Sequence, residues 1–200
     1  MSFSYVLKLF IHPSVGWAAI HARRYSVAGV FIGHTLLFAL IPAVAGYIGT
    51  TQVGWQVADG EVIRLTGASA GNIALLYYLA MVAGVATVGA AIHWMGKTYG
   101  ADQPIGQCIA LASFSATPLF LIGALQAYPV LWLNLVAGLP VLAFTTYIFF
   151  TGVPIMMEIP QERGFLFSSA MLAFGLVTLV AMLAVTALLW GTGFAPSFTS

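Results

Sequence analysis

The sequence predicts an all-α polytopic membrane protein, a bundle of five transmembrane helices with an interfacial amphipathic segment at its N-terminus. Of its 200 residues 61% are hydrophobic and 6% are charged, and the mean hydropathy is +1.01, values that lie outside the soluble class. A helix needs about 20 apolar residues to cross the roughly 30 Å hydrocarbon core. Residues 105–152 hold two such lengths without one Asp, Glu, Lys or Arg.

The composition also excludes several functions. A formal net charge of +1 provides no basic field for many phosphate contacts, so we expect no nucleic-acid partner. Cys108 is the only cysteine, so it has no partner for an intramolecular disulfide, a metal cage or a C-x-x-C redox pair. We therefore expect neither metal nor cofactor.

Residues 1–26 form the predicted cytoplasmic and interfacial N-terminal segment. Its large apolar side chains recur at roughly helical spacing, with cations between and after them: Phe3, Leu7, Phe10, Trp17 and Ile20, with Lys8, Arg23 and Arg24. This pattern is typical of a helix that inserts its rings into the membrane interface and keeps its cations at the headgroups. The alternative is a disordered tail, but the density of aromatic residues argues against it.

The predicted spans cover about residues 27–48, 72–95, 105–128, 130–152 and 165–190. Residues 27–191 are then the transmembrane domain, and residues 192–200 a short periplasmic tail. Spans three and four form a hairpin that turns at Tyr128-Pro129. Between spans one and two, the turn residues Ala58-Asp59-Gly60 predict a short hairpin or a re-entrant loop on the membrane surface.

The cations predict the orientation, because Lys and Arg are concentrated in cytoplasmic loops. A cytoplasmic N-terminus puts five of the six cations inside (Lys8, Arg23, Arg24, Lys97 and Arg163) and only Arg64 outside. The C-terminus is then periplasmic. Trp17 and Trp94 are expected at the inner interface, and Trp55, Trp132 and Trp190 at the outer one.

Polar side chains at membrane depth are the candidate site residues, because lipid offers them no hydrogen-bond partner. Helical spacing groups most of them into stripes that are expected to face one another: Asn72 and Thr87 with Ala83 and Ala90 on span two, Cys108, Ser115 and Gln126 on span three, and Asn134, Gly138 and Thr145 on span four. Thr117 also lies on span three. The stripes are either helix contacts or the lining of a narrow polar path, and the sequence does not separate the two.

His34 is the only ionisable residue well within a span. An imidazole at this depth could relay protons, or it could be a neutral ring that is hydrogen-bonded to a neighbouring helix. No Asp or Glu lies at comparable depth. His93, which precedes Trp94, is expected at the interface.

Three prolines interrupt the spans, Pro42, Pro118 and Pro140, and each predicts a kink that shapes packing or acts as a hinge. The chain has no motif for a catalytic nucleophile, a zinc site or a phosphate loop, and all five carboxylates lie in loops. Glu158 and Glu162 are four residues apart and could share a helical face, but a solvated surface is the favoured interpretation. We therefore do not expect an enzyme.

Several segments carry a family resemblance: F-I-H-P-S-V-G-W-A-A-I at residues 10–20, I-G-T-T-Q-V-G-W at 48–55, A-D-G at 58–60, A-T-P-L-F-L at 116–121 and Y-P-V-L-W-L at 128–133. They resemble the bacterial branch of the Yip family, named for Ypt- and Rab-interacting proteins, over nearly the whole chain. The resemblance implies five spans in a bacterial inner membrane, with a cytoplasmic N-terminus. It implies no active-site residues. GTPase binding does not carry over, because eukaryotic relatives bind through a longer acidic, Tyr-Gly-Pro-bearing N-terminal region that this sequence lacks.

Two functions follow as hypotheses. The first is a non-enzymatic protein that organises or binds other membrane components, with lipids, a second copy or other membrane proteins as partners. Gly29-x-x-x-Gly33 is the candidate contact between helices. The alternative is a small permease or an ion or proton conductor with a polar path around His34.

Overall fold

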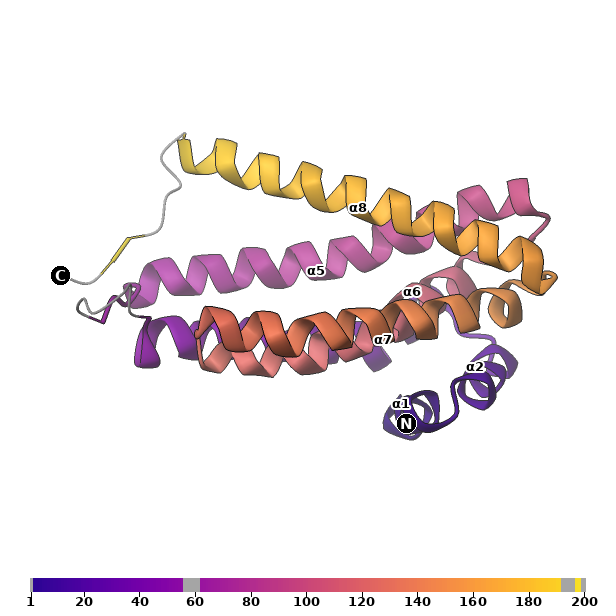
Figure 1. Ribbon diagram of the computed structural model, residues 1–200, viewed down its shortest axis with the longest axis horizontal. Coiled ribbons are helices and arrows are strands. Elements are labelled where there is room, and N and C mark those ends of the chain that lie inside the picture. The colour runs from indigo at the N-terminus through magenta and orange to yellow at the C-terminus, as the bar shows by residue number, and fades with distance from the viewer. Residues whose placement is uncertain (1, 56–61, 192–196, 199–200) are drawn as a thin grey trace.

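The computed structural model describes residues 2–55, 62–191 and 197–198 (Figure 1). Within them most of the chain is helical. The elements in order are α1 (Ser2–Ile11), α2 (Pro13–Ala22), α3 (Val27–Val30), the π turn η1 (Phe31–Thr35), α4 (Leu36–Ile48), the π turn η2 (Gly49–Val53), α5 (Gly67–Gly96), η3 (Lys97–Tyr99), α6 (Ile105–Ile122), η4 (Gly123–Ala127), α7 (Leu131–Met157) and α8 (Gln161–Gly191). Five stretches are long and apolar enough to cross a membrane: Val27–Val53, Gly67–Tyr99, Ile105–Ala127, Leu131–Met157 and Gln161–Leu188. The predicted all-α class with five spanning helices is confirmed.

Helix α6 lies at the centre of the bundle and packs against α3, α4, α5 and α7. In its most apolar stretch 67% of the residues are buried, compared with 11% for α5 and for α7 and 6% for α8. Its sequence explains the position, because I-A-L-A-S-F-S-A at residues 109–116 alternates bulky with small side chains and lets neighbouring helices approach closely. The other spans therefore present most of their surface outward.

Helix ends differ from the predicted span ends by several residues. The first span continues through η2 to Val53, where the Thr50 and Thr51 hydroxyls donate to the carbonyls of the preceding turn. Helix α5 begins at Gly67 because Thr66 caps it, accepting a hydrogen bond of 3.3 Å from the Ser69 amide. Helix α7 runs past Pro154, which the sequence analysis assigned to a connection.

Glu158 ends α7 in the left-handed conformation, with φ of 54°, and the chain re-enters a helix at Gln161. Glu162 lies in the first turn of α8. The two glutamates do not share one helical face, because a reversal of the chain separates them. Both are exposed, as the favoured interpretation of a solvated surface predicts.

The end of the bundle that holds the C-terminus carries two short antiparallel contacts (Figure 1). Trp55 and Ile63 exchange backbone hydrogen bonds of 3.0 and 2.9 Å, and Leu65 pairs with Phe198. The turn predicted at Ala58-Asp59-Gly60 lies outside the described residues.

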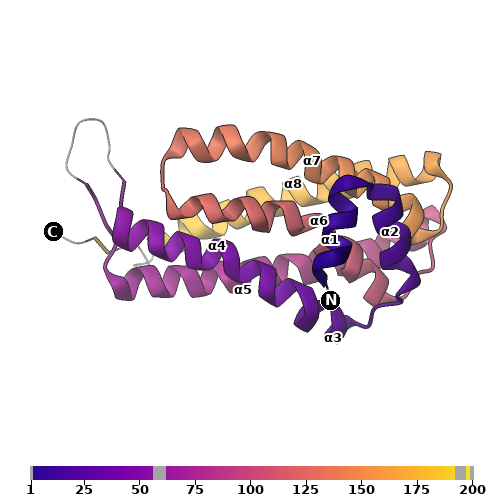
Figure 2. The same cartoon turned by 90° about the horizontal axis from the view of Figure 1, so that it is seen from below.

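Helices α1 and α2 lie across the other helices at the end away from the C-terminus (Figure 2). Gly16 allows them to pack closely, because a Cβ there would lie 2.7 Å from the Cα of Leu9. Trp17 and Ile20 were expected to insert into the membrane interface, but both are 0% exposed and buried within the protein. That expectation is wrong for these two side chains. The depth of Trp17 at the inner interface stays a prediction.

Candidate functional site

Four polar side chains from the first and third spans meet at membrane depth and form the His34 cluster: His34, Thr35, Ser113 and Thr117, all of them buried. The Nε2 atom of His34 lies 2.8 Å from the Thr117 Oγ1, and the Thr35 Oγ1 lies 2.7 Å from the Ser113 Oγ. The Thr117 hydroxyl also donates to the Ser113 carbonyl over 3.3 Å. Polar groups of two helices thus bond to each other inside the bundle.

The π turn η1 explains how two consecutive residues both face α6. A π turn holds an extra residue, so that adjacent side chains can point to one side of the helix. The His34 ring stacks on Phe114 with centroids 4.1 Å apart, and lies 4.4 Å from Phe38. The sequence analysis identified His34 and Thr117 but missed Thr35 and Ser113. The position of Thr35 depends on the π turn, which helical spacing does not predict. Ser113 lies one turn before Thr117 on the same face of α6, so spacing could have found it.

The predicted stripes do not face one another, and that expectation is wrong. Asn72 and Thr87 are exposed, together with Ala83 and Ala90 of the same stripe. Helix α5 instead turns Val85, Gly89 and Ile92 inward. A Cβ on Gly89 would lie 2.9 Å from the Cα of Ile109, so α5 and α6 touch at the backbone there.

The remaining candidates are spread along the bundle. Asn134 donates to the carbonyls of Tyr128 and Val130, 2.9 Å each, and so closes the turn before its own helix. Gln126 donates to the Tyr77 hydroxyl at 3.0 Å. The hydroxyls of Ser115 and Thr145 are buried, and neither has a hydrogen-bond partner within the described part of the chain.

The three prolines lie inside α4, α6 and α7. Pro42 packs so closely on Gly123 that a side chain at residue 123 would overlap it. Pro154 was missed as a further proline of α7, and it packs against Gly164 of α8. At Pro42 and Pro154, proline thus meets glycine at a contact between elements.

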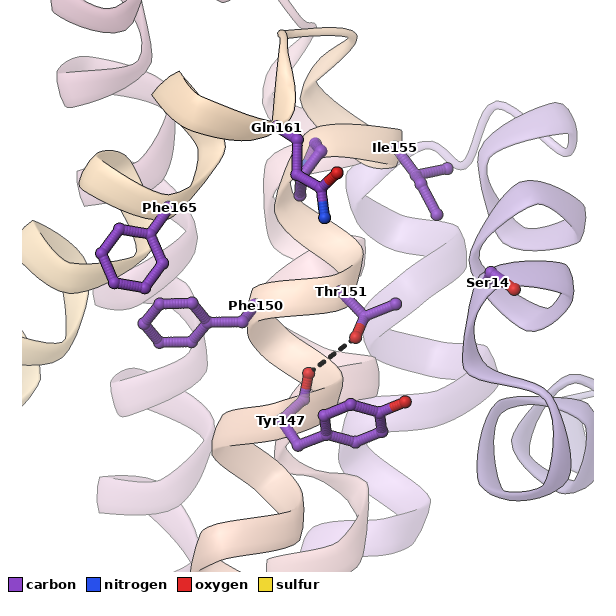
Figure 3. Close-up of a pocket in the computed structure, with 8 residues that line it drawn as sticks. Ser14, Tyr147, Phe150, Thr151, Ile155, Gln161 and Phe165 are labelled. Carbon is purple, nitrogen blue, oxygen red and sulfur yellow. Dashed lines mark hydrogen bonds between the residues drawn. The ribbon is translucent and has the colours of Figure 1, made fainter.

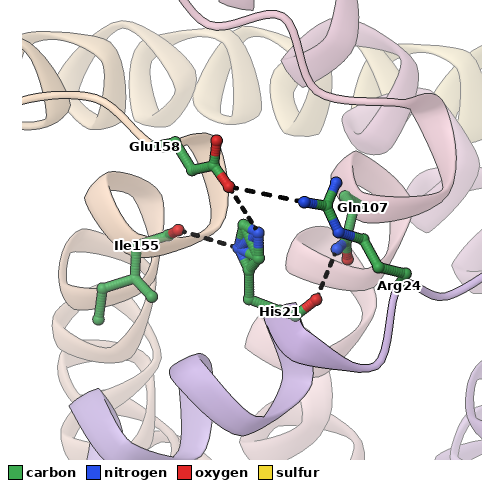
Figure 4. A network of polar contacts seen from close by, with 5 residues as sticks. All are labelled: His21, Arg24, Gln107, Ile155 and Glu158. Carbon is green, nitrogen blue, oxygen red and sulfur yellow. Dashed lines mark hydrogen bonds and ion pairs between the residues drawn. The ribbon is translucent and has the colours of Figure 1, made fainter.

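A second group of contacts, the N-terminal dock, joins α2 to α6 and α7 through Trp17, His21, Gln107 and Glu158. Figure 4 shows the part of the dock around His21. The Nε2 atom of His21 lies 3.0 Å from the Glu158 Oε1, and its Nδ1 lies 3.2 Å from the Ile155 carbonyl. Gln107 donates to the His21 carbonyl over 2.8 Å. The sequence analysis missed this group, because each of its contacts joins residues more than 80 positions apart in the sequence.

The turn that follows α2 completes the dock. The Arg24 Nη2 lies 3.9 Å from the Glu158 Oε1, and the Arg23 guanidinium lies 5.3 Å from the centroid of the Tyr25 ring. Burial raises the pKa of Tyr25 above 10.0, and the charge of Arg23 opposes this. The Tyr25 carbonyl packs directly on Gly106, so the turn is held against the start of α6.

His93 was expected at the interface, but it is half-buried and its Nδ1 lies 3.0 Å from the Gln103 carbonyl. It therefore links the end of α5 to the approach to α6. Within residues 2–55, 62–191 and 197–198, no group of three His, Cys, Asp or Glu is placed to hold a metal ion.

Five apolar helices in one bundle, with α6 at its centre, define an α-helical integral membrane protein. The Yip1 domain family model matches residues 7–182, so the chain belongs to the Yip1 domain family. Its relatives include the inner membrane protein YohC of Escherichia coli strain K12 and that of Escherichia coli strain CFT073. Each is 38% identical over 191 residues, which cover 96% of this chain and 98% of the relative. No solved structure matches significantly.

These comparisons confirm the predicted family and its bacterial branch. The relatives are named for the inner membrane, and neither their name nor the family description states an enzymatic activity.

Proposed function

We propose that this protein is a non-enzymatic organiser of the inner membrane, which acts by binding lipids and other membrane proteins, including a second copy of itself. One observation carries the proposal: polar groups at membrane depth are paired inside the bundle at the His34 cluster, whereas in the most apolar stretches of α5, α7 and α8 only 11%, 11% and 6% of the residues are buried. Such a molecule offers surface rather than an internal reaction site.

The proposal includes a cytoplasmic N-terminus and a periplasmic C-terminus. Helices α1 and α2, η3 and the α7–α8 connection lie at one end of the bundle, and the C-terminus lies at the other (Figure 1). Five cations belong to the first end and Arg64 to the second, which supports this orientation. Reporters fused to the two termini should be active on opposite sides of the membrane, and activity on the same side would contradict the orientation.

The proposed contact face for a second copy lies on the first span. Gly33 is exposed, and a Cβ there would meet no heavy atom within 4 Å. An open apolar groove of about 360 Å³ adjoins this span, lined by Leu40, Ala43, Val44, Tyr47, Ala74, Leu75 and Tyr78. Small residues on an exposed helix allow a second helix to approach closely in lipid.

Cross-linking in native membranes tests this face. Gly33→Leu should abolish the cross-linked dimer without loss of folded protein, because nothing in the monomer occupies the added volume. Gly175→Leu on α8 is the matched control, since that site is also open. Gly29→Leu is less clean, because a Cβ there would lie 3.0 Å from the Ser26 hydroxyl that caps the helix. A protein that is never cross-linked, or that responds equally to both variants, would remove support for self-association.

The buried hydroxyls of Ser115 and Thr145, which have no partner in the described residues, favour a second candidate, a proton or ion conductor. Buried polar atoms of this kind are commonly satisfied by water. Purified protein in liposomes would then carry a proton or cation flux that His34→Ala abolishes. A flux equal to that of protein-free liposomes would eliminate this candidate.

A further inference from the structure

An open groove of about 500 Å³ runs along α7 between α2 and the start of α8 (Figure 3). Its floor and walls are formed by Ser14 of α2, by Tyr147, Phe150, Thr151, Pro154 and Ile155 of α7, and by Gln161 and Phe165 of α8. The volume falls within the range of about 300–1,000 Å³ that is typical of sites for small organic ligands. None of the eight side chains carries a charge.

Both walls are held in place by close packing. On one side the Trp17 indole of α2 lies directly on Gly152, where any side chain would overlap it. On the other, a Cβ on Gly164 would lie 2.6 Å from the Pro154 ring, and the rings of Phe150 and Phe165 have centroids 5.4 Å apart. The groove is thus a feature of the packed fold.

The depth of the groove matches one leaflet of the bilayer. Helix α7 has 27 residues and is about 40 Å long at about 1.5 Å per residue, which exceeds the roughly 30 Å hydrocarbon core. Ile155 lies near the end of α7 and Gln161 at the start of α8, both near the headgroups, whereas Tyr147 lies about 12 Å from Ile155 along α7, among the acyl chains. The groove therefore extends from the headgroup region into the hydrocarbon.

The chemistry of the lining follows the same gradient. The rings of Phe150 and Phe165 form the deeper part beside α8, and the Gln161 amide lies over the upper end (Figure 3). The Thr151 hydroxyl donates to the Tyr147 carbonyl over 2.9 Å, so it presents its methyl-bearing carbon rather than a free donor. The polar groups of this neutral, mostly apolar trough are the Gln161 amide at its upper end, the Ser14 hydroxyl on the α2 side and the Tyr147 phenol at its deeper end. The rings and aliphatic carbons between them complement an acyl chain below an ester and a headgroup.

We propose that this groove binds one phospholipid of the leaflet on the N-terminal side of the bundle. One acyl chain lies between α2 and α8 along Tyr147 and Phe150, and the glycerol backbone lies at Ser14 and Gln161. The groove is continuous with the lipid-facing surfaces of α7 and α8, so phospholipid is the molecule present there at the highest concentration. Binding depends on the chain rather than on the headgroup, because the lining is uncharged.

Photo-cross-linking of the full-length protein in nanodiscs tests the site. The probes are two phosphatidylcholines, one with a photoreactive group near the ester of an acyl chain and one with it in the middle of that chain. The upper probe should label residues 155–161, and the mid-chain probe should label residues 147–150 and Phe165, as mapped by mass spectrometry. Phosphatidylglycerol probes should give the same pattern and yield.

Ser14→Trp should fill the groove from the α2 side and reduce this labelling several-fold. Val15→Trp is the matched control, because Val15 is its exposed neighbour and does not line the groove, and it should leave the labelling unchanged. Gln161→Trp fills the groove from the other wall and serves if Ser14→Trp does not fold. Labelling spread evenly over all spans and unaffected by either filling variant would overturn the proposal. So would a marked preference for one headgroup, or cross-links from these residues to a second protein copy in place of lipid.

Discussion

The indole Nε1 of Trp17 donates a hydrogen bond of 2.9 Å to the backbone carbonyl of Ile148 and so joins α2 to α7 across 131 residues of sequence. The indole can reach the backbone because Gly152, one turn further along α7, presents no side chain. In a membrane-spanning helix, the side chains of the following turn normally cover a backbone carbonyl and keep other donors away from it. The N-terminal helices are therefore packed against the bundle as part of the fold.

Gly152→Leu is expected to undock α2, because the new side chain would overlap the Trp17 ring. Overpacking of this kind costs about 1–3 kcal/mol of unfolding free energy. The measurement is limited proteolysis in detergent, with cleavage between α2 and α3 as the readout, together with the midpoint of thermal unfolding. Gly138→Leu in the same helix is the control, since its site is open. Equal resistance of both variants to proteolysis would contradict the docked arrangement.

Trp17→Phe and Trp17→Ala separate the hydrogen bond from the packing. The first keeps a ring and loses the donor, which should cost about 1 kcal/mol. The second also leaves a large cavity beside α7, which should cost about 3–5 kcal/mol. Both free energies are measured by denaturant titration in micelles. If Trp17→Ala were no worse than an exposed Leu139→Ala, Trp17 would not be buried.

His21 and Glu158 should be coupled in a double-mutant cycle of His21→Ala and Glu158→Gln. The Glu158 side chain is 56% exposed, so a coupling of only about 0.2–1 kcal/mol is expected. Ile155 O and the Glu158 carboxylate both accept, so the two contacts of His21 coexist only when each ring nitrogen carries a proton. A coupling of zero would argue against a contact between the two side chains.

Two glycines of α5 should respond in opposite ways to the same change. Gly89→Leu should strongly destabilise the bundle, because even its Cβ would lie 2.9 Å from the Ile109 backbone and would force α5 away from α6. Gly84→Leu, five residues earlier, meets nothing within 4 Å and should be tolerated. Expression level and thermal stability of the purified proteins are the measurements. Equal tolerance of both variants would mean that α5 packs through a different face.

His34 and Thr117 should show a small favourable coupling in a double-mutant cycle of His34→Phe and Thr117→Val. Hydrogen bonds between membrane helices average about 0.6 kcal/mol, and phenylalanine preserves the stacking on Phe114. The unfolding free energy in micelles gives this coupling. A coupling of zero would show that the two side chains do not contact each other.

Composition and apolar run lengths were sufficient to predict the class, the number of spans and the close α6–α7 hairpin, because the bilayer imposes these on any chain of this kind. The inward face of each helix was not predictable in the same way. Asn72 and Thr87 share a stripe by spacing, yet the side of α5 that meets α6 is the one that carries Gly89. Glycine has no side chain, so a hydrophobicity pattern does not identify it as a contact residue. Thr35 was missed because its position beside His34 depends on the π turn η1, which regular helical spacing does not predict.

The sequence by itself determined the five membrane-spanning helices. With 61% hydrophobic residues, transfer of the apolar runs into lipid is favourable whichever residues contact one another. Only the tertiary structure decided that Trp17 packs on α7, that His34 contacts Thr117, and that a neutral groove lies between α2 and α8. The reason is physical: lipid is as apolar as the side chains. Hydrophobicity therefore drives helices into the membrane but does not select their neighbours, which close packing and a few hydrogen bonds choose.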